Sequence, residues 1–364
     1  MDKRYRELAR VVIDHSLEVH PGQSVLIRFD TAGARFAEVF AQEVLRVNAH
    51  PVFEFSSPRA AAVRIAEGSP EQLAFVHPSE VARTDCDCQV LIEAPTGLTL
   101  PEFEPERLAT RTQALAEWRR RIEHVRYAIV LVPTLHLARS LGMEFEACED
   151  FVFNVTVGVD WVRMARRAQK IKQVFDAGSL VRIEAPGTEI SFSLAGRSGA
   201  AAAGQRNIPD GKVFFAPVVE TVKGFITFHD TLWALGGPVR GLQLDFRDGR
   251  VVHVDAQEGL GRVRALLQTD SGANCIGEFG IGINPTIDRI TGHVLLDEKA
   301  AGTVHFALGR SLPGTGGDVE SAVHWAMVLD LRRGGQVLLD DQVVCRDGKW
   351  YLGRPAVGVA TAGA

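Results

Sequence analysis

The 364-residue chain has no long basic block and no apolar run of about 18 residues, the length that a membrane-spanning helix needs. Its net charge is −5 and 23% of its residues are charged, so we expect neither a nucleic-acid partner nor a membrane partner. The first residues, Met1-Asp2-Lys3-Arg4, lack the apolar core of a signal peptide. The sequence therefore predicts a cytoplasmic protein.

Cysteine is also scarce, with five residues in the whole chain. Their spacing suits neither a zinc ribbon nor a disulfide framework, so we expect reduced thiols of a cytoplasmic protein. A Gly-x-Gly-x-x-Gly motif is absent after the first predicted strand, which argues against a dinucleotide cofactor.

The length of the chain favours two domains, and its first half alternates predicted helices with short apolar strands. These strands are continuous apolar runs, which is typical of strands buried on both faces of a parallel sheet. The first half therefore predicts an α/β domain with an open, mostly parallel sheet, over residues 1–177. The expected helices are 6–19, 33–47, 70–75, 79–83, 105–124 and 158–177, and the expected strands are 24–27, 51–55, 88–92 and 127–132.

The pattern changes after the helix expected at 158–177. Short strands with turn signals between them follow, and Asp248-Gly249 is typical of a two-residue hairpin turn. We expect a β-rich α+β domain over residues 178–364, and this domain carries the candidate site residues. Its expected strands are 180–183, 190–194, 212–216, 225–228, 239–246 and 250–255, with a helix at 259–267.

Three residues on separate segments of this second half could form a site: Glu278, His305 and His324. Glu278 precedes an apolar run, where a charge is costly unless it is paired or binds a metal ion. Carboxylates and imidazoles hold zinc, cobalt, manganese or ferrous iron. The alternative is structural, with Glu278 in an ion pair and each histidine hydrogen-bonded in the core.

Five segments of the second half carry further motifs: 204–217, 278–285, 297–299, 302–309 and 321–330. They resemble the M29 family of aminopeptidase T-like, thermophilic metallopeptidases. The resemblance implies a two-domain, usually dimeric enzyme that removes N-terminal amino acids from peptides with two metal ions. It places Glu278, His305 and His324 where metal ligands of the family stand.

The chain also departs from the family pattern at three positions. Lys212 stands where the family has a glutamate ligand, Leu312 where it has a tyrosine, and Ala326 where it has an aspartate. Two metal ions need several carboxylates to offset their repulsion, so these departures predict one divalent ion, zinc, cobalt, manganese or iron. Lys212 then serves as a fixed positive charge against Glu278, and the two are the candidate catalytic residues. The alternative is that Lys212 points to solvent.

Three functions follow from this interpretation. The first is a metal-dependent hydrolase of the aminopeptidase type, homodimeric and acting on a small peptide or amide. The second is a ferrous dioxygenase that cleaves a hydroxylated aromatic ring, since two histidines and one carboxylate leave positions open for dioxygen. The third is a metal-free descendant that binds or transforms a small molecule in the same site.

Overall fold

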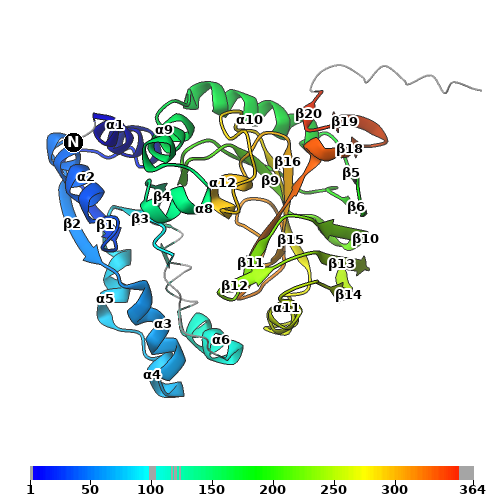
Figure 1. Cartoon of the computed structure of the whole chain (residues 1–364), viewed down its shortest axis with the longest axis horizontal. Coiled ribbons are helices and arrows are strands. Elements are labelled where there is room, and N and C mark those ends of the chain that lie inside the picture. Colours follow the sequence, from blue (N-terminus) through cyan, green and yellow to red (C-terminus); the bar gives the residue numbers. More distant parts are fainter. Residues whose placement is uncertain (1–2, 98–103, 116–117, 119–120, 123, 352–364) are drawn as a thin grey trace, which may run out of the picture. The chain divides into compact units, whose positions relative to one another are not determined.

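The computed structural model describes residues 3–97, 104–115, 118, 121–122 and 124–351. Contacts divide the chain into two compact units (Figure 1). The first unit comprises Met1–Met164 and Ala202–Gly211, and the second comprises Ala165–Ala201 and Lys212–Ala364. The division at residues 177 and 178 stays a prediction, because compactness alone does not show which segments fold independently.

The first unit is built on a parallel sheet with the strand order β2-β1-β3-β4-β8. The neighbouring strands of this sheet pair in parallel in the described residues, and no residue of β1 or β3 is exposed, in keeping with their apolar sequences. The expected α/β architecture is therefore confirmed. The strands are β1 (Ser24–Phe29), β2 (His50–Phe55), β3 (Cys88–Glu93), β4 (Arg126–Leu131) and β8 (Asn207–Ile208).

Helices connect these strands, and three of them were not predicted: α3, α8 and α9. Side-chain caps mark the starts of two: Ser57 accepts a hydrogen bond from the Ala60 amide, and Thr134 accepts one from the Leu137 amide. In the helix predicted at 105–124, residues 116–117, 119–120 and 123 lie outside the described part. The helices are α1 (Lys3–Val11), continued by a π-helical turn (Val12–Ser16), α2 (Ala34–Arg46), α3 (Pro58–Glu67), α4 (Pro70–Ala74), α5 (Pro78–Val81), continued by a 3₁₀ turn (Ala82–Thr84), α6 (Pro105–Ala114), α8 (Leu135–Ser140) and α9 (Phe145–Thr156).

The second unit contains an eight-stranded sheet with the order β14-β13-β10-β6-β5-β18-β19-β20. Its neighbouring strands pair antiparallel in the described residues, which confirms the β-rich α+β half. Asp248 and Gly249 form the predicted two-residue turn between β13 and β14, both with positive φ. The strands are β5 (Leu180–Ala185), β6 (Thr188–Ser193), β10 (Val218–Phe228), β13 (Leu242–Arg247), β14 (Arg250–Asp255), β18 (Gln336–Leu339), β19 (Gln342–Arg346) and β20 (Lys349–Trp350).

A five-stranded sheet with the order β17-β16-β15-β9-β7 packs in the same unit (Figure 1). Its strands are β7 (Ala200–Ala202), β9 (Lys212–Phe215), β15 (Ile276–Gly282), β16 (Thr303–Gly309) and β17 (His324–Asp330). The strand predicted at 239–246 is interrupted at Arg240 and Gly241, so that it forms β12 in a small hairpin and β13 in the large sheet. The remaining elements are α10 (Trp161–Asp176), β11 (Leu232–Ala234), β12 (Gly237–Val239), α11 (Leu260–Leu267), α12 (Val294–Asp297) and a 3₁₀ turn (Leu331–Arg333).

The five-stranded sheet has two chemically different faces, because successive side chains of a strand alternate between them. One face carries Phe215, Phe279 and Phe306, all buried. The Phe279 ring centroid lies 5.0 Å from that of Phe192 on β6, so this face forms the core between the two sheets. Burying each such ring contributes about 1.5–3 kcal/mol. The packing of this apolar face holds the sheet in the core of the unit. The opposite face carries Lys212, Glu278 and His305.

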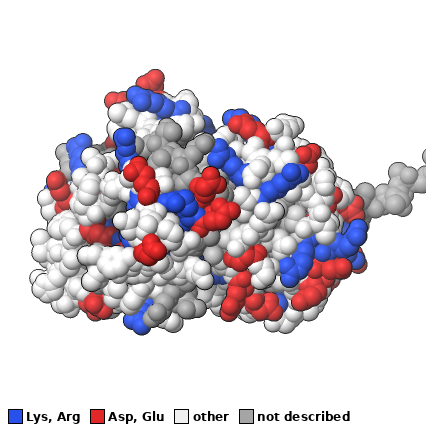
Figure 2. Space-filling model, turned by 90° about the horizontal axis from the view of Figure 1, so that it is seen from below, with Lys and Arg blue, Asp and Glu red and all other residues white. Residues whose placement is uncertain are grey.

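The described surface shows no large region of one charge sign on the face drawn in Figure 2, where acidic and basic side chains are interspersed. The chain has 40 lysines and arginines and 45 aspartates and glutamates, which accounts for the mixture. In the described part of the chain, none of the helices combines the length and the apolar character that crossing a membrane requires.

Candidate active site

The polar face of the five-stranded sheet brings Lys212, Glu278, His305 and His324 together from four neighbouring strands. Glu278 lies on β15, between β9 with Lys212 and β16 with His305. The registers pair Lys212 with Gly282, and His305 with Gly280. All three predicted metal-binding residues and the predicted lysine therefore meet in one cluster.

Glu278 is the centre of the cluster, and its residue is only 1% exposed. Its Oε1 atom accepts hydrogen bonds from Lys212 Nζ and from His305 Nε2, each at 2.9 Å. Lys212 is buried as well, so the alternative in which it points to solvent is wrong. A buried lysine needs such a partner, since an unpaired ammonium in the interior is very costly.

A second carboxylate, Glu298, belongs to the same cluster and was not predicted as a site residue. It caps the C-terminal end of α12, and its Oε2 atom lies 3.2 Å from Lys212 Nζ. Its other oxygen accepts a hydrogen bond from Lys299, which is fully buried. The available sequence signal was the charged run Asp297-Glu298-Lys299 directly after the apolar pair at 295 and 296, since charges next to a buried segment need partners.

The opposite charges in this cluster keep one another ionised despite burial. Burial alone would lower the pKa of Lys212, but the Glu278 and Glu298 carboxylates outweigh it and hold that pKa above its usual value. Burial would raise the pKa of Glu278, yet the Lys212 ammonium and the His305 hydrogen bond hold it well below its usual range. The same balance, set by Lys212 and Lys299, lowers the pKa of Glu298. Both carboxylates and the Lys212 ammonium are therefore charged at neutral pH.

His305 is the neutral member of the cluster. Burial and the nearby Lys212 charge lower the pKa of its imidazole. Its ring needs the space above Gly280, because a Cβ atom at residue 280 would lie 2.1 Å from His305 Nε2. The ring's other nitrogen, Nδ1, is buried without a hydrogen-bond partner among the described residues.

His324 approaches the free oxygen of Glu278 from the other side. Its Nδ1 atom lies 2.9 Å from the carbonyl oxygen of Arg310 and donates a hydrogen bond to it. Its Nε2 atom lies 3.2 Å from Glu278 Oε2, the oxygen that Lys212 and His305 leave free. The His324 side chain is 28% exposed, so this is also the side that solvent reaches.

The structure also shows where Ala326 and Leu312 lie, the two residues that replace the aspartate and the tyrosine of the family pattern. Ala326 lies two residues after His324 on β17, on the same face of the sheet, and pairs with Ala307. Leu312 follows β16, and its carbonyl oxygen accepts a hydrogen bond from Thr315. Neither residue adds a charge to the cluster.

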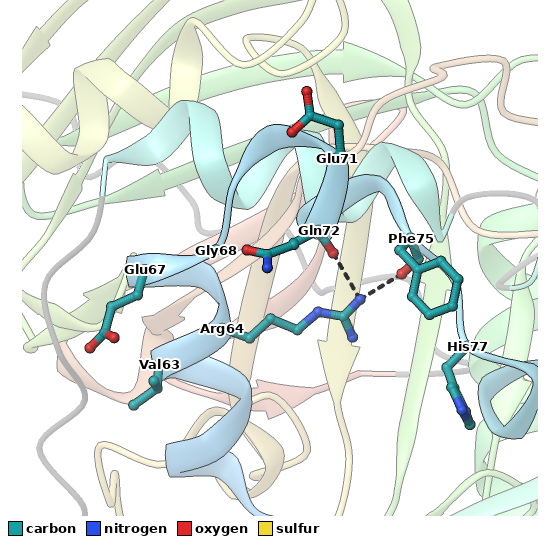
Figure 3. A pocket seen from close by; sticks show the side chains of 8 residues that line it. All are labelled: Val63, Arg64, Glu67, Gly68, Glu71, Gln72, Phe75 and His77. Carbon is teal, nitrogen blue, oxygen red and sulfur yellow. Dashed lines mark hydrogen bonds between the residues drawn. The ribbon is translucent and has the colours of Figure 1, made fainter.

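Two hollows elsewhere hold none of these residues. In the one shown in Figure 3, Arg64 donates hydrogen bonds to the carbonyl oxygens of Gln72 and Phe75, so its charge holds α3 and α4 together. The other is lined by segments 230–231, 288–292, 330 and 332–333, where Arg289, Arg332 and Arg333 each pair with an aspartate.

Comparison with known proteins decides the family. The model of the Thermophilic metalloprotease (M29) family matches residues 1–350. The chain belongs to this family. Membership confirms the resemblance seen in the sequence and makes the chain an enzyme of the hydrolase class.

Individual members of the M29 family agree with this assignment. Aminopeptidase 2 of Geobacillus stearothermophilus is 25% identical over 352 residues, which cover 86% of this chain and 84% of that protein. Aminopeptidase T of Thermus thermophilus is 35% identical over 147 residues, about a third of each chain. The structure of wild-type AmpT from Thermus thermophilus superposes with a TM-score of 0.81 over 96% of this chain and 99% of that one, at 23% identity, and confirms the fold.

Membership of the M29 metalloprotease family raises the question of which residues could hold a metal ion. In the described ranges, no group of three or more histidine, cysteine, aspartate or glutamate side chains is arranged to hold one. Glu278 and His305 are drawn together by a hydrogen bond, and Lys212 occupies the space between the two carboxylates. The cluster therefore does not fit two ions. Glu278 Oε2 and His324 Nε2, 3.2 Å apart, are donor types that a single divalent ion would bind.

Proposed function

We propose that the chain is a divergent aminopeptidase-type hydrolase that acts on a small peptide or amide with one divalent metal ion. Glu278, His305 and His324 are its proposed ligands. The observation that carries the proposal is the convergence of two ligand-type atoms, His324 Nε2 and Glu278 Oε2, which lie 3.2 Å apart on the side of the cluster that solvent reaches. A ring whose other nitrogen donates to a backbone carbonyl is a common arrangement of metal-binding histidines.

The proposed ligands have distinct roles. Glu278 stays ionised, because its pKa is held well below its usual range, and it can therefore bind a cation at neutral pH. His324 is held in the correct tautomer by Arg310. His305 donates Nε2–H to Glu278, and it serves as a ligand once that proton moves to Nδ1. A bound divalent ion would supply Lewis acidity for the amide carbonyl and for the attacking water.

Lys212 supplies a charge-assisted hydrogen bond in this proposal. Two of its three N–H groups face the carboxylates of Glu278 and Glu298, which leaves one. That donor would stabilise negative charge that develops on the amide oxygen. Substrate would enter beside His324, whose imidazole is the most exposed of the cluster.

The test is hydrolysis of a leucyl anilide by the purified full-length protein with cobalt, zinc or manganese. We expect release of leucine, and a loss of at least about 100-fold in kcat/KM for His324→Ala, since an interaction made at the reacting centre is removed. His253→Gln, an exposed histidine on β14, is the matched control and should keep the activity. Absence of turnover on any amide with any of the three metals would eliminate the proposal.

A metal-free descendant is the second candidate, favoured by the Lys212 and Lys299 ammonium groups that already pair with both carboxylates. Elemental analysis of protein purified without chelator separates the two, and less than about a tenth of an equivalent of transition metal would favour this candidate. Oxygen uptake with a hydroxylated aromatic substrate and ferrous iron would instead indicate a ring-cleaving dioxygenase.

A further inference from the structure

We infer that the Lys212 ammonium permanently occupies a cation position between Glu278 and Glu298, so that the site excludes a second divalent ion there. The inference deepens the proposed function, on which it rests for the first ion. It concerns the number of ions that the cluster binds, and the residue that sets this number.

The first support is geometric. Lys212 Nζ lies 2.9 Å from Glu278 Oε1 and 3.2 Å from Glu298 Oε2, so it bridges carboxylates that are 20 residues apart along the chain. A cation that bridges two carboxylates would need the same oxygens. The ammonium and an ion therefore compete for one position.

The second support is that Lys212 has little freedom to leave. It begins β9, which pairs with β15 in the middle of the sheet, and the whole residue is 6% exposed. Its Nζ atom also lies 5.0 Å from the ring centroid of Phe214, within the range of a cation–π contact. Moving the ammonium out of the cluster would expose two buried carboxylates to each other.

The third support is the charge sequence across the cluster. Lys299, Glu298, Lys212 and Glu278 form a row of alternating charges, joined by salt bridges. Because each carboxylate already faces an ammonium, a divalent ion placed in the row would meet net repulsion from both lysines. The other oxygen of Glu278, Oε2, points away from this row to His324 Nε2, 3.2 Å away. The structure thus separates a filled cation position from one that can accept an ion.

The experiment counts metal ions in four full-length proteins after equilibrium dialysis against zinc, and separately against manganese: wild type, Lys212→Gln, Lys212→Arg and Lys223→Gln. Lys223 is an exposed lysine on β10 in the same unit and is the matched control. We expect Lys212→Gln to bind one equivalent more than wild type. Lys212→Arg and Lys223→Gln should bind the wild-type number, because both retain a cation at residue 212.

The outcomes separate this inference from the proposed function. Equal numbers in wild type and Lys212→Gln would overturn the inference, whereas one equivalent in both would leave the one-ion proposal standing. No metal in wild type and one equivalent in Lys212→Gln would support the inference and remove the proposal. If Lys212→Gln folds only when zinc or manganese is added, as judged by circular dichroism, that dependence supports the inference. A variant that stays unfolded at saturating metal contradicts it.

Discussion

Gly280 lies directly opposite His305 on the neighbouring strand, and the imidazole occupies the space that a side chain at residue 280 would need. A Cβ atom there would come within 2.1 Å of His305 Nε2. The backbone of Gly280 is not in the left-handed region, so the requirement for glycine is one of space alone. Gly280, which has no functional side chain, thus allows the His305 imidazole to take its position in the site.

Gly280→Ala should therefore displace the His305 ring. We expect the free energy of unfolding to fall by about 1–3 kcal/mol, the usual cost of overpacking. We expect kcat/KM to fall by about 100-fold, since misplacement by about 1 Å has this effect. Gly261→Ala is the control, because Gly261 on α11 has open space around its Cβ position and should tolerate alanine. Equal effects of the two substitutions in denaturant titration and activity assay would contradict the account.

Lys212→Met should destabilise the protein strongly, because it leaves Glu278 and Glu298 buried without their shared cation. We expect a loss of about 3–5 kcal/mol in the free energy of unfolding, measured with urea. Adding Glu278→Gln should restore part of that loss, since the two residues interact directly. Arg240→Gln breaks the exposed pair with Glu258 and should cost at most about 1 kcal/mol. A Lys212→Met cost no larger than the Arg240→Gln cost would show that the cluster is not a coupled buried network.

His293 should make stability depend on pH. Burial, aided by the Lys299 charge, lowers the pKa of His293 from 6.5 to about 4. Below pH 6.5 the unfolded chain binds a proton that the folded state does not bind until pH falls to about 4. This histidine's contribution to stability is therefore complete above pH 6.5 and is lost as pH falls through this window, by up to about 1.4 kcal/mol per pH unit.

The measurement for His293 is the free energy of unfolding at pH 7 and pH 5. His293→Gln should lose less stability between the two values than wild type does. His253→Gln, which changes an exposed histidine on β14, should keep the wild-type slope. An unchanged slope in His293→Gln would disprove the assignment.

Ala326→Asp should strengthen metal binding. Residue 326 lies on the same face of β17 as His324, so a carboxylate there adds a negatively charged donor to the cluster. We expect the dissociation constant for zinc to fall at least about tenfold, equivalent to about 1.4 kcal/mol. Ala322→Asp adds the same charge at an exposed residue just before β17 and should change the constant little. Calorimetry that finds equal affinities for both variants would place the ion away from Ala326.

Much of the architecture could be predicted from the sequence because its strands carry local signals. The apolar runs of β1 and β3 and the Asp248-Gly249 turn are patterns within a few residues. The helices α8 and α9 were missed because their starting signals, such as the Thr134 cap, are short. Local patterns do not decide such segments without the packing that stabilises them.

The site residues, too, divide into those that local sequence predicts and those that depend on packing. Glu278, His305 and His324 could be named from their residue types and segments, and the structure brings them together. The direction of Lys212 could not be predicted, because it depends on the register of β9 against β15. Glu298 was missed because its role appears only when α12 is packed beside Lys212.

The central claim is that Glu278, His305 and His324 hold one divalent ion beside a resident ammonium. Crystals of the full-length protein soaked in zinc and measured at the zinc absorption edge test this claim directly. We predict one anomalous peak within ligand distance of these three side chains, about 2.0–2.2 Å, and none between Glu278 and Glu298. A map without a peak at the cluster, or with a peak in the place of the Lys212 ammonium, would contradict the account.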